Sequence, residues 1–454
     1  MRRMPNLYAW MMNFHNKPSK PVAAWLIAAC LITGGAAVHA QAVELSLSDA
    51  ISIALEQNYG IVISGSQARI ASISNTWGTA GRYPTLSFDA GSSNSLELTD
   101  NSSLNRLSGG LGLNWTIFDG LRVQVTKEKL EGLEKLAGGQ EAVVIENTVE
   151  DVILGYYYVL LQQESLGIRR KVMDLSEDRY HYELARHELG GSVTYNVLLA
   201  QNVYLSDKAG FMNQEVALRT AVRNFNFLLG EDAAEQWDFT ETFEPDTAAY
   251  KLDELLDRMM SSNQVLRNQY TNLVLRQQDT RLQESGLYPS LGLSAGIDWS
   301  DSRMVPDAGD PVTSNSLSPY GNLSLTYRIF QGGTRRSAIR IARVNEEIAG
   351  VEITEMEHSL TNEMMNASDL YNVRIELFRL ACDNLAAAEL NLKIADEKFR
   401  SGVINSFNYR DIQLIYLNAA LDRLEAVFNL IGSRTELTRL TGGFLQPGVA
   451  DGGQ

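Results

Sequence analysis

An internal duplication constrains this chain more than any other feature of its sequence. Landmarks of the first half recur in the second at nearly constant spacing: Tyr83-Pro84 and Tyr288-Pro289 lie 205 residues apart, and Phe118/Phe330, Gly190/Gly402, Gln201/Gln413 and Gly230/Gly442 lie 212 apart. The seven extra residues of the second half therefore fall between Tyr288 and Phe330. A repeat whose insertions are confined to one loop produces this pattern. We place the repeats at 41–230 and 251–442, with a connector at 231–250 and a tail at 443–454.

Each repeat contains three segments with a helical period. Apolar residues at this spacing predict helices at 46–82, from 121 to about 189 and at 195–229, with counterparts at 251–287, to about 400 and at 407–441. The long helices have about 70 residues, or about 105 Å at 1.5 Å per residue. In each repeat the two shorter helices, stacked end to end, match the long one. Each repeat therefore predicts two helical columns.

Between the first helix and the long helix of each repeat, the period changes to that of a strand. Apolar residues alternate with glycine or small polar residues in four segments, at 85–90, 107–117, 290–299 and 322–329. This pattern predicts two strands in each repeat (about 83–118 and 288–330), joined by polar loops at about 92–106 and 300–319. Strands of this length can cross a membrane, with the apolar face toward lipid and the small polar face toward water.

Four strands cannot close a barrel by themselves, and an open strand edge is not viable in lipid. Three copies of the chain would supply 3 × 4 = 12 strands, a size known for outer-membrane barrels. The same three copies would bring twelve helical columns. We therefore expect an α+β membrane protein whose copies share one barrel, and three copies would give a 12-stranded β-barrel atop a long α-helical barrel.

The first 40 residues have the layout of a secretory signal peptide. Four basic residues and no acid precede an apolar run, and cleavage is expected after Ala40. A lipoprotein signal with Cys30 as the lipidated residue is the alternative. The remaining chain has 35 Lys and Arg against 55 Asp and Glu, a net charge of −20, which argues against a nucleic-acid partner. No later stretch has about 18 uninterrupted apolar residues, so no transmembrane helix is expected.

In this order, the motifs of the chain resemble those of the TolC-type outer-membrane efflux and secretion channels. The resemblance covers 41–445 and rests on LSDAISIALEQN (47–58), Tyr-Pro-x-Leu at 83 and 288, Phe-x-Gly at 118 and 330, GGSVTYNVLLAQ (190–201) and SGVINSFN (401–408). It implies a homotrimer in outer-membrane lipid with a periplasmic tunnel. It also implies a periplasmic adaptor that links the trimer to an inner-membrane transporter.

The resemblance assigns roles to two groups of residues near the helical turns. The tips that contact the adaptor would be Gly190, Gly191, Ser192, Val193, Thr194, Gly402, Val403 and Ile404. The periplasmic aperture would be formed by Tyr195, Asn196, Phe399, Asn408 and Asp411. Asn196 and Asn408 stand where acids are common in the family, and Ile404 where a basic residue can occur. We therefore expect packing of Tyr195 and Phe399, with amide hydrogen bonds, rather than ion pairs to close the aperture.

The remaining candidate sites have ordinary structural explanations. His181 and His187 are too far apart on a helix to share a metal, Asp301, Asp307 and Asp310 do not have calcium-loop spacing, and no motif calls for a cofactor or a catalytic residue. Tyr83, Trp115, Trp299 and Tyr327 fit an interfacial aromatic belt or a packed core. Efflux of small toxic compounds is the leading hypothesis. A type I protein secretion channel is a close alternative, and a periplasmic coiled-coil scaffold is disfavoured by the strands.

Overall fold

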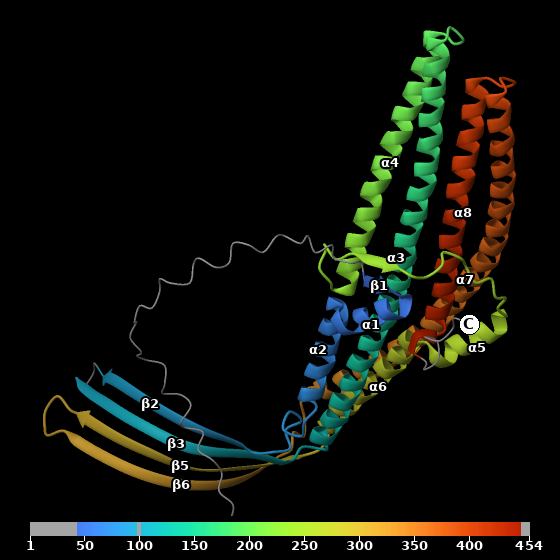
Figure 1. Ribbon diagram of the computed structural model, residues 1–454. Coiled ribbons are helices and arrows are strands. Elements are labelled where there is room, and N and C mark those ends of the chain that lie inside the picture. Colours follow the sequence, from blue (N-terminus) through green and yellow to red (C-terminus); the bar gives the residue numbers. More distant parts are fainter. Residues whose placement is uncertain (1–42, 98–100, 446–454) are drawn as a thin grey trace, which may run out of the picture. The chain divides into compact units, whose positions relative to one another are not determined.

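The computed structural model describes residues 43–97 and 101–445 (Figure 1). The predicted signal peptide, Cys30 and Ala40 lie outside the described residues, as does most of the predicted tail. In the first half the elements are α1 (Leu47–Gln57), α2 (Tyr59–Ser74), β2 (Thr85–Glu97), β3 (Ser102–Phe118), α3 (Arg122–Glu188) and α4 (Thr194–Leu229). In the second half they are α5 (Leu252–Ser262), α6 (Gln264–Ser285), β5 (Ser290–Val305), β6 (Val312–Thr326), α7 (Thr334–Arg400) and α8 (Ser406–Leu440). The two halves thus have the same order of elements.

The first helix of each repeat is broken at an asparagine, so the single helices expected at 46–82 and 251–287 are wrong. Asn58 separates α1 from α2, and Asn263 separates α5 from α6. Each side chain accepts hydrogen bonds from the first backbone N–H groups of the helix that follows, as an N-cap does. The first of these columns also ends early, at Ser74, where Asn75 binds Lys127 of α3.

Both breaks are fixed by the end of the return helix of the same repeat. The Asn58 amide donates to the carbonyl oxygen of Leu228 at 2.7 Å, and the Asn263 amide donates to that of Leu440 at 3.1 Å. The glycine that follows each return helix has a positive φ, +84° at Gly230 and +65° at Gly442. The two halves therefore form the same junction between the broken column and the return helix.

The two long helices, α3 and α7, have 67 residues each, or about 100 Å. α3 packs against α2 and α4 from its own repeat, and α7 packs against α6 and α8 (Figure 1). Contacts of α3 with α6 and α8 join the repeats. Stacking of the shorter helices beside each long one, expected from their lengths, is therefore observed.

The hydrophobic core is divided among three clusters of buried side chains along these helices. The first is centred on Tyr156 and Phe225, and the second on Met364 and Tyr371. The third, closest to the hairpin tips, contains Val172, Phe399 and Tyr409. No described helix combines the length and apolarity that a membrane crossing requires.

The four long strands form one antiparallel sheet in the order β2-β3-β5-β6. The strands are longer than predicted, because Ser92–Glu97, Ser102–Arg106, Ser300–Val305 and Val312–Pro319 pair in register although we expected loops there. Serine, asparagine and charged residues occupy both faces of these extensions, so the alternation that identifies a strand in a sequence is lost there. At its other end β6 stops at Thr326, before Tyr327 and Ile329, which we expected to continue it.

The connector between the repeats is more ordered than expected. Its residues Trp237–Phe239 form β4, which pairs with β1 (Val43–Leu45). Tyr156 of α3 donates a hydrogen bond to Leu45 O and accepts two from backbone N–H groups of the connector. Tyr371 of α7 donates to Ala248 O at 2.7 Å. A buried tyrosine from each long helix thus holds this segment.

Candidate functional site

One face of the sheet is apolar across all four strands. Directly paired residues share a face, and five successive rows of this face carry almost only apolar side chains or glycine. The rows run from Phe118–Leu291–Leu325 to Ala90–Gly109–Trp299–Leu317. They span about 27 Å along the strands at 3.4 Å per residue. The next row is Ser92–Leu107–Asp301–Asn315. Leu107 is its one apolar member, so the apolar band ends within this row.

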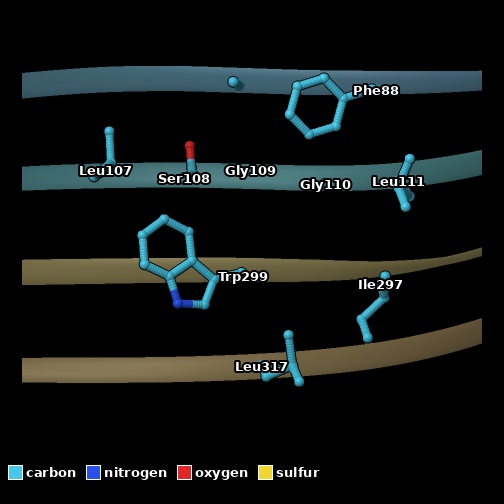
Figure 2. A pocket seen from close by; sticks show the side chains of 10 residues that line it. Phe88, Leu107, Ser108, Gly109, Gly110, Leu111, Ile297, Trp299 and Leu317 are labelled. Carbon is cyan, nitrogen blue, oxygen red and sulfur yellow. The ribbon is translucent and has the colours of Figure 1, made fainter.

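The last apolar row contains a recess. Gly109 and Ala90 leave a space of 420 Å³ bordered by Phe88, Leu107, Trp299 and Leu317 (Figure 2). The Trp299 indole donates to the Asn315 side chain in the next row at 3.1 Å. Trp299 therefore has an apolar body within the band and a polar contact at its rim, as expected for the proposed aromatic belt.

The opposite face of the sheet carries small and polar residues. Tyr320 lies over Gly296, where an added Cβ would approach its hydroxyl oxygen to 2.7 Å. Asp298 lies beside Gly110, which leaves no room for a larger side chain. These contacts explain why glycine alternates with leucine in this sheet. Leucine supplies the apolar face, whereas glycine on the opposite face leaves space for a neighbouring side chain.

Both helical hairpins turn through a glycine in the left-handed region. Gly190 and Gly402 each have a φ of +76°, a conformation that favours glycine. The N–H groups of Gly191 and Val403 bond back to the carbonyl oxygens of Arg186 and Lys398 at 2.7 and 2.8 Å. This hydrogen bonding is that of a Schellman motif. The two tips therefore have the same backbone conformation and hydrogen bonding.

The predicted tip residues differ in exposure. Gly190, Gly191, Val193, Thr194, Gly402 and Val403 are exposed, whereas Ser192 and Ile404 are half-buried. Ser192 donates to the buried Glu183 carboxylate at 2.6 Å, and Ile404 packs against the third core cluster. Thr194 is the first residue of α4 rather than part of the turn. The most exposed apolar side chains at the tips are those of Leu189, Val193, Tyr195, Val403 and Phe407.

Of the predicted aperture residues, Phe399 alone is buried. Its ring stacks on Tyr409, with centroids 4.8 Å apart and an interplanar angle of 4°, and also contacts Tyr182. Tyr195 is 71% exposed and lies in the other hairpin, so within the chain Phe399 is packed and Tyr195 is not. Burial, and after it the charge of Asp396, raises the pKa of Tyr409 to about 12.

The three polar aperture residues lie at the starts of the return helices. Asn196 donates to Ser192 Oγ at 3.3 Å within the first tip. Asn408 and Asp411 are exposed on α8 and, three residues apart, lie on one face of it. The structure thus leaves Asp411 as an exposed carboxylate within the chain.

An ion pair that the sequence did not reveal joins the two hairpins. Arg410 of α8 donates two hydrogen bonds to the carboxylate of Asp207 of α4, both at 2.7 Å. The side chains are 17% and 8% exposed. No pattern within either helix predicts this pair, because its members are 203 residues apart and meet only when the hairpins pack together. Neither Asp207 nor Arg410 is among the predicted aperture residues, so the expectation that ion pairs do not close the aperture stays a prediction.

Metal binding has no support in the described part of the chain, where no group of histidine, cysteine or acidic side chains has a suitable arrangement. The His187 ring contacts Ser192 O at the first tip, and His181 lies against Tyr180. Asp307 accepts a hydrogen bond from Asn101 and so links the two strand loops.

Two comparisons with known proteins give a consistent result. The model of the outer membrane efflux protein family matches residues 255–443, most of the second repeat. Among solved structures, CusC has a TM-score of 0.71 at 16% identity and covers 88% of this chain and 92% of its own. The Campylobacter jejuni CmeC outer membrane channel has a TM-score of 0.72 at 14% identity, covering 87% and 85%.

VceC from Vibrio cholerae, an outer membrane protein, has a TM-score of 0.68 at 12% identity and covers 87% of this chain and 96% of its own. At such identities the likeness shows a shared fold. No curated protein matches the sequence. Together, the family match in the second repeat and the shared fold confirm the resemblance to TolC-type channels that the motifs indicated.

Proposed function

We propose that this chain forms a homotrimeric outer-membrane exit duct that carries small toxic compounds from an inner-membrane pump to the exterior. The observation that carries the proposal concerns the outermost strands of the sheet and the outermost helices beside it. Each of these elements has a neighbour on one side only, and the outermost strands and helices occupy matching places in the two orders. In the sheet, β2 and β6 each pair on one side only within the chain. Beside the sheet, α2 packs on α3, α3 on α6 and α6 on α7, so α2 and α7 are the corresponding helical edges.

The helical edges carry exposed apolar stripes. On α2 the stripe consists of Tyr59, Val62, Ile63, Ile70 and Ile73, and on α7 of Ile341, Val344, Ile348 and Val351. Residues at three- and four-residue spacing lie on one side of a helix, and an exposed apolar stripe of this kind marks an interaction surface. Pairing α2 with α7 and β2 with β6 of the next copy would cover both edges at once.

Closure of such a ring explains both sides of the sheet. Three copies would supply twelve strands, with the apolar band outside and the glycine- and serine-rich face around the lumen. The band of about 27 Å is close to the apolar height of about 25 Å that outer-membrane barrels present to lipid. The number three rests on the resemblance to TolC-type channels.

The hairpin tips are the proposed contact with a periplasmic adaptor, which in turn would hold the inner-membrane transporter. Their turns have the same backbone conformation, and the apolar side chains of both tips are exposed to solvent. In the aperture, we propose that Phe399 stacked on Tyr409 supports the narrow end from behind, while Tyr195, Asn408 and Asp411 face the lumen or a neighbouring copy. The match to the outer membrane efflux protein family supports a channel of this kind, and small-molecule export is the leading proposal, with a type I protein secretion channel as the alternative.

Three measurements test this function. Outer-membrane fractions should contain a trimer that resists detergent without heating, and the purified trimer should conduct ions in planar bilayers. Deletion of the gene should lower resistance to small toxic compounds, and the intact gene should restore it. A chain that stays monomeric or does not conduct would contradict the duct. A loss of protein secretion at unchanged resistance would support the secretion alternative instead.

A further inference from the structure

The stretch that leads from the sheet into α7 has a charge opposite to that of the rest of the chain. Residues 311–345 contain no acid, no lysine and five arginines, which are Arg328, Arg335, Arg336, Arg340 and Arg343. The chain without its predicted signal peptide has a net charge of −20. The corresponding residues of the first repeat, 212 positions earlier, are Thr116, Val123, Gln124, Glu128 and Glu131. The first repeat therefore builds the same junction without an arginine cluster.

Most of these arginines have no acidic partner. Arg343 forms an ion pair with Glu284 of α6 at 2.8 Å, and Arg335 donates to a backbone oxygen at 3.5 Å. Arg336 and Arg340 are exposed, and neither pairs with any residue in the described part of the chain. The first turn of α7 has no acid, although the N-terminus of a helix favours acids over arginines. The cluster thus carries positive charge that the chain does not compensate.

Arg336 and Arg340 lie on a side of α7 that no neighbouring helix would cover. Being four residues apart, they share one side of the helix. Arg340 stands between Ile339, which is buried, and Ile341, which belongs to the exposed apolar stripe, and it lies about 100° from each around the helix. In the proposed ring, the next copy covers the stripe of Ile341. The side with the arginines then stays uncovered in every copy.

The cluster follows directly on the apolar band of the sheet. Leu325 belongs to the last row of the band, and the residues after the strand include Tyr327, Ile329 and Phe330, which are 57%, 88% and 86% exposed. Side chains of this kind suit the outer surface next to lipid better than the lining of a water-filled tunnel. Arg340 lies about 9 Å along α7 from its first residue. The arginines therefore lie where the lipid headgroups would begin.

We propose that this arginine cluster binds the phosphate groups of anionic phospholipids in the periplasmic leaflet of the outer membrane. The proposal rests on the duct function proposed above and adds a lipid partner to it. A guanidinium group can donate two parallel hydrogen bonds to one phosphate, and basic residues beside exposed apolar ones are typical of segments at a membrane surface. Anionic headgroups supply the negative charge that the chain lacks at this place.

Lipid binding by the purified trimer tests the proposal. Mass spectrometry of the intact trimer, titrated with phosphatidylglycerol or with phosphatidylcholine of the same acyl chains, gives the affinity for each lipid. The wild type should bind phosphatidylglycerol several-fold more tightly, and this preference should shrink as the ammonium acetate concentration rises. Arg336→Gln combined with Arg340→Gln should remove most of the preference. Arg336→Lys combined with Arg340→Lys should retain most of it, because the charge is kept.

Arg219→Gln combined with Arg223→Gln is the matched control. These two arginines are also exposed and four residues apart, but they lie on α4, which packs on α3 and α1 rather than on the sheet. This control should keep the full preference for phosphatidylglycerol. Soluble glycerol phosphate should compete weakly, because it lacks the acyl chains. Competition as strong as that of the lipid would show a site for soluble phosphates and contradict the proposal.

The remaining outcomes separate the lipid site from the duct. Equal affinity of the wild type for the two lipids would overturn the proposal, as would an undiminished preference in the glutamine variant. Ion selectivity that changes in this variant at an unchanged lipid preference would place the arginines in the tunnel and also overturn it. A wild type that forms no trimer or conducts no current would overturn the duct function, whereas conducting trimers without a lipid preference would overturn the lipid site alone.

Discussion

At the scale of single residues, the connector between the repeats depends on Tyr156. This side chain is fully buried, and its hydroxyl donates to Leu45 O at 2.8 Å and accepts from the N–H groups of Thr240 and Glu241 at 3.1 and 3.2 Å. Tyr156→Phe would leave three backbone groups without this partner. We expect the free energy of unfolding to fall by about 1–3 kcal/mol, measured by denaturant titration. Tyr158→Phe, at an exposed position, is the control and should change little. Equal losses in both variants would contradict this role.

A second residue, Glu146, couples stability to pH. Its side chain is 4% exposed, and one carboxylate oxygen has no hydrogen-bond partner. Burial raises its pKa from 4.5 to about 7, although Arg439 and Arg267 oppose the shift. Because the folded state holds the proton more tightly, the stabilising contribution is complete below 4.5 and is lost as pH rises through about 7.

Glu146→Gln should therefore raise stability above about pH 7 and flatten its pH dependence. The gain should be on the order of 2–3 kcal/mol when the wild-type carboxyl is fully ionised. Thermal unfolding midpoints measured across this range provide the test. Glu355→Gln, at an exposed position of α7, removes the same charge and should leave the pH profile unchanged. A wild-type midpoint that does not fall as pH rises through about 7 would refute the assignment.

At the scale of elements, the sequence predicted what depends on neighbours along the chain and missed what depends on distant partners. The strands were recognised where one face is apolar, and the long helices where glycine ended them. The breaks at Asn58 and Asn263 were missed, because each asparagine amide donates to a carbonyl oxygen that is distant in sequence, 170 and 177 residues away. The pair Asp207–Arg410 was missed for the same reason. The tip glycines were predicted, because their positive φ is a local requirement.

The hairpin tips yield a prediction at this scale. Val403 is 70% exposed and follows the glycine that makes the turn, so a new charge there should leave the fold intact. We expect Val403→Glu to abolish export while trimers still form, because a charge would have to be desolvated in an apolar contact with the adaptor. Val403→Thr keeps the size without the charge and should retain most export. Compound resistance and unheated gels measure the two properties, and normal export by Val403→Glu would exclude this tip as a contact.

At the scale of the whole molecule, the matching order of strands and helices determines how copies would meet. The strand order β2-β3-β5-β6 is repeated by the helical order α2-α3-α6-α7, so both layers have their edges at the same places. One contact between neighbouring copies would satisfy both. Ile70 precedes the start of β2 by 15 residues, and Ile341 follows the end of β6 by the same number. These two side chains should therefore lie at similar heights on the facing edges.

Cysteines at these positions distinguish a closed ring from open association. In a chain whose Cys382 is replaced by serine, Ile70→Cys combined with Ile341→Cys places one thiol on each edge. Oxidation of a closed trimer should then yield a covalent species of three times the monomer mass, because every copy is joined on both sides. Open head-to-tail association would instead give a ladder of increasing mass. Ile70→Cys combined with Leu380→Cys, at an exposed position of α7 that lies 39 residues farther along the helix than Ile341, should give mainly monomer. A ladder, or no crosslink with the Ile341 thiol, would rule out pairing of these edges in a three-membered ring.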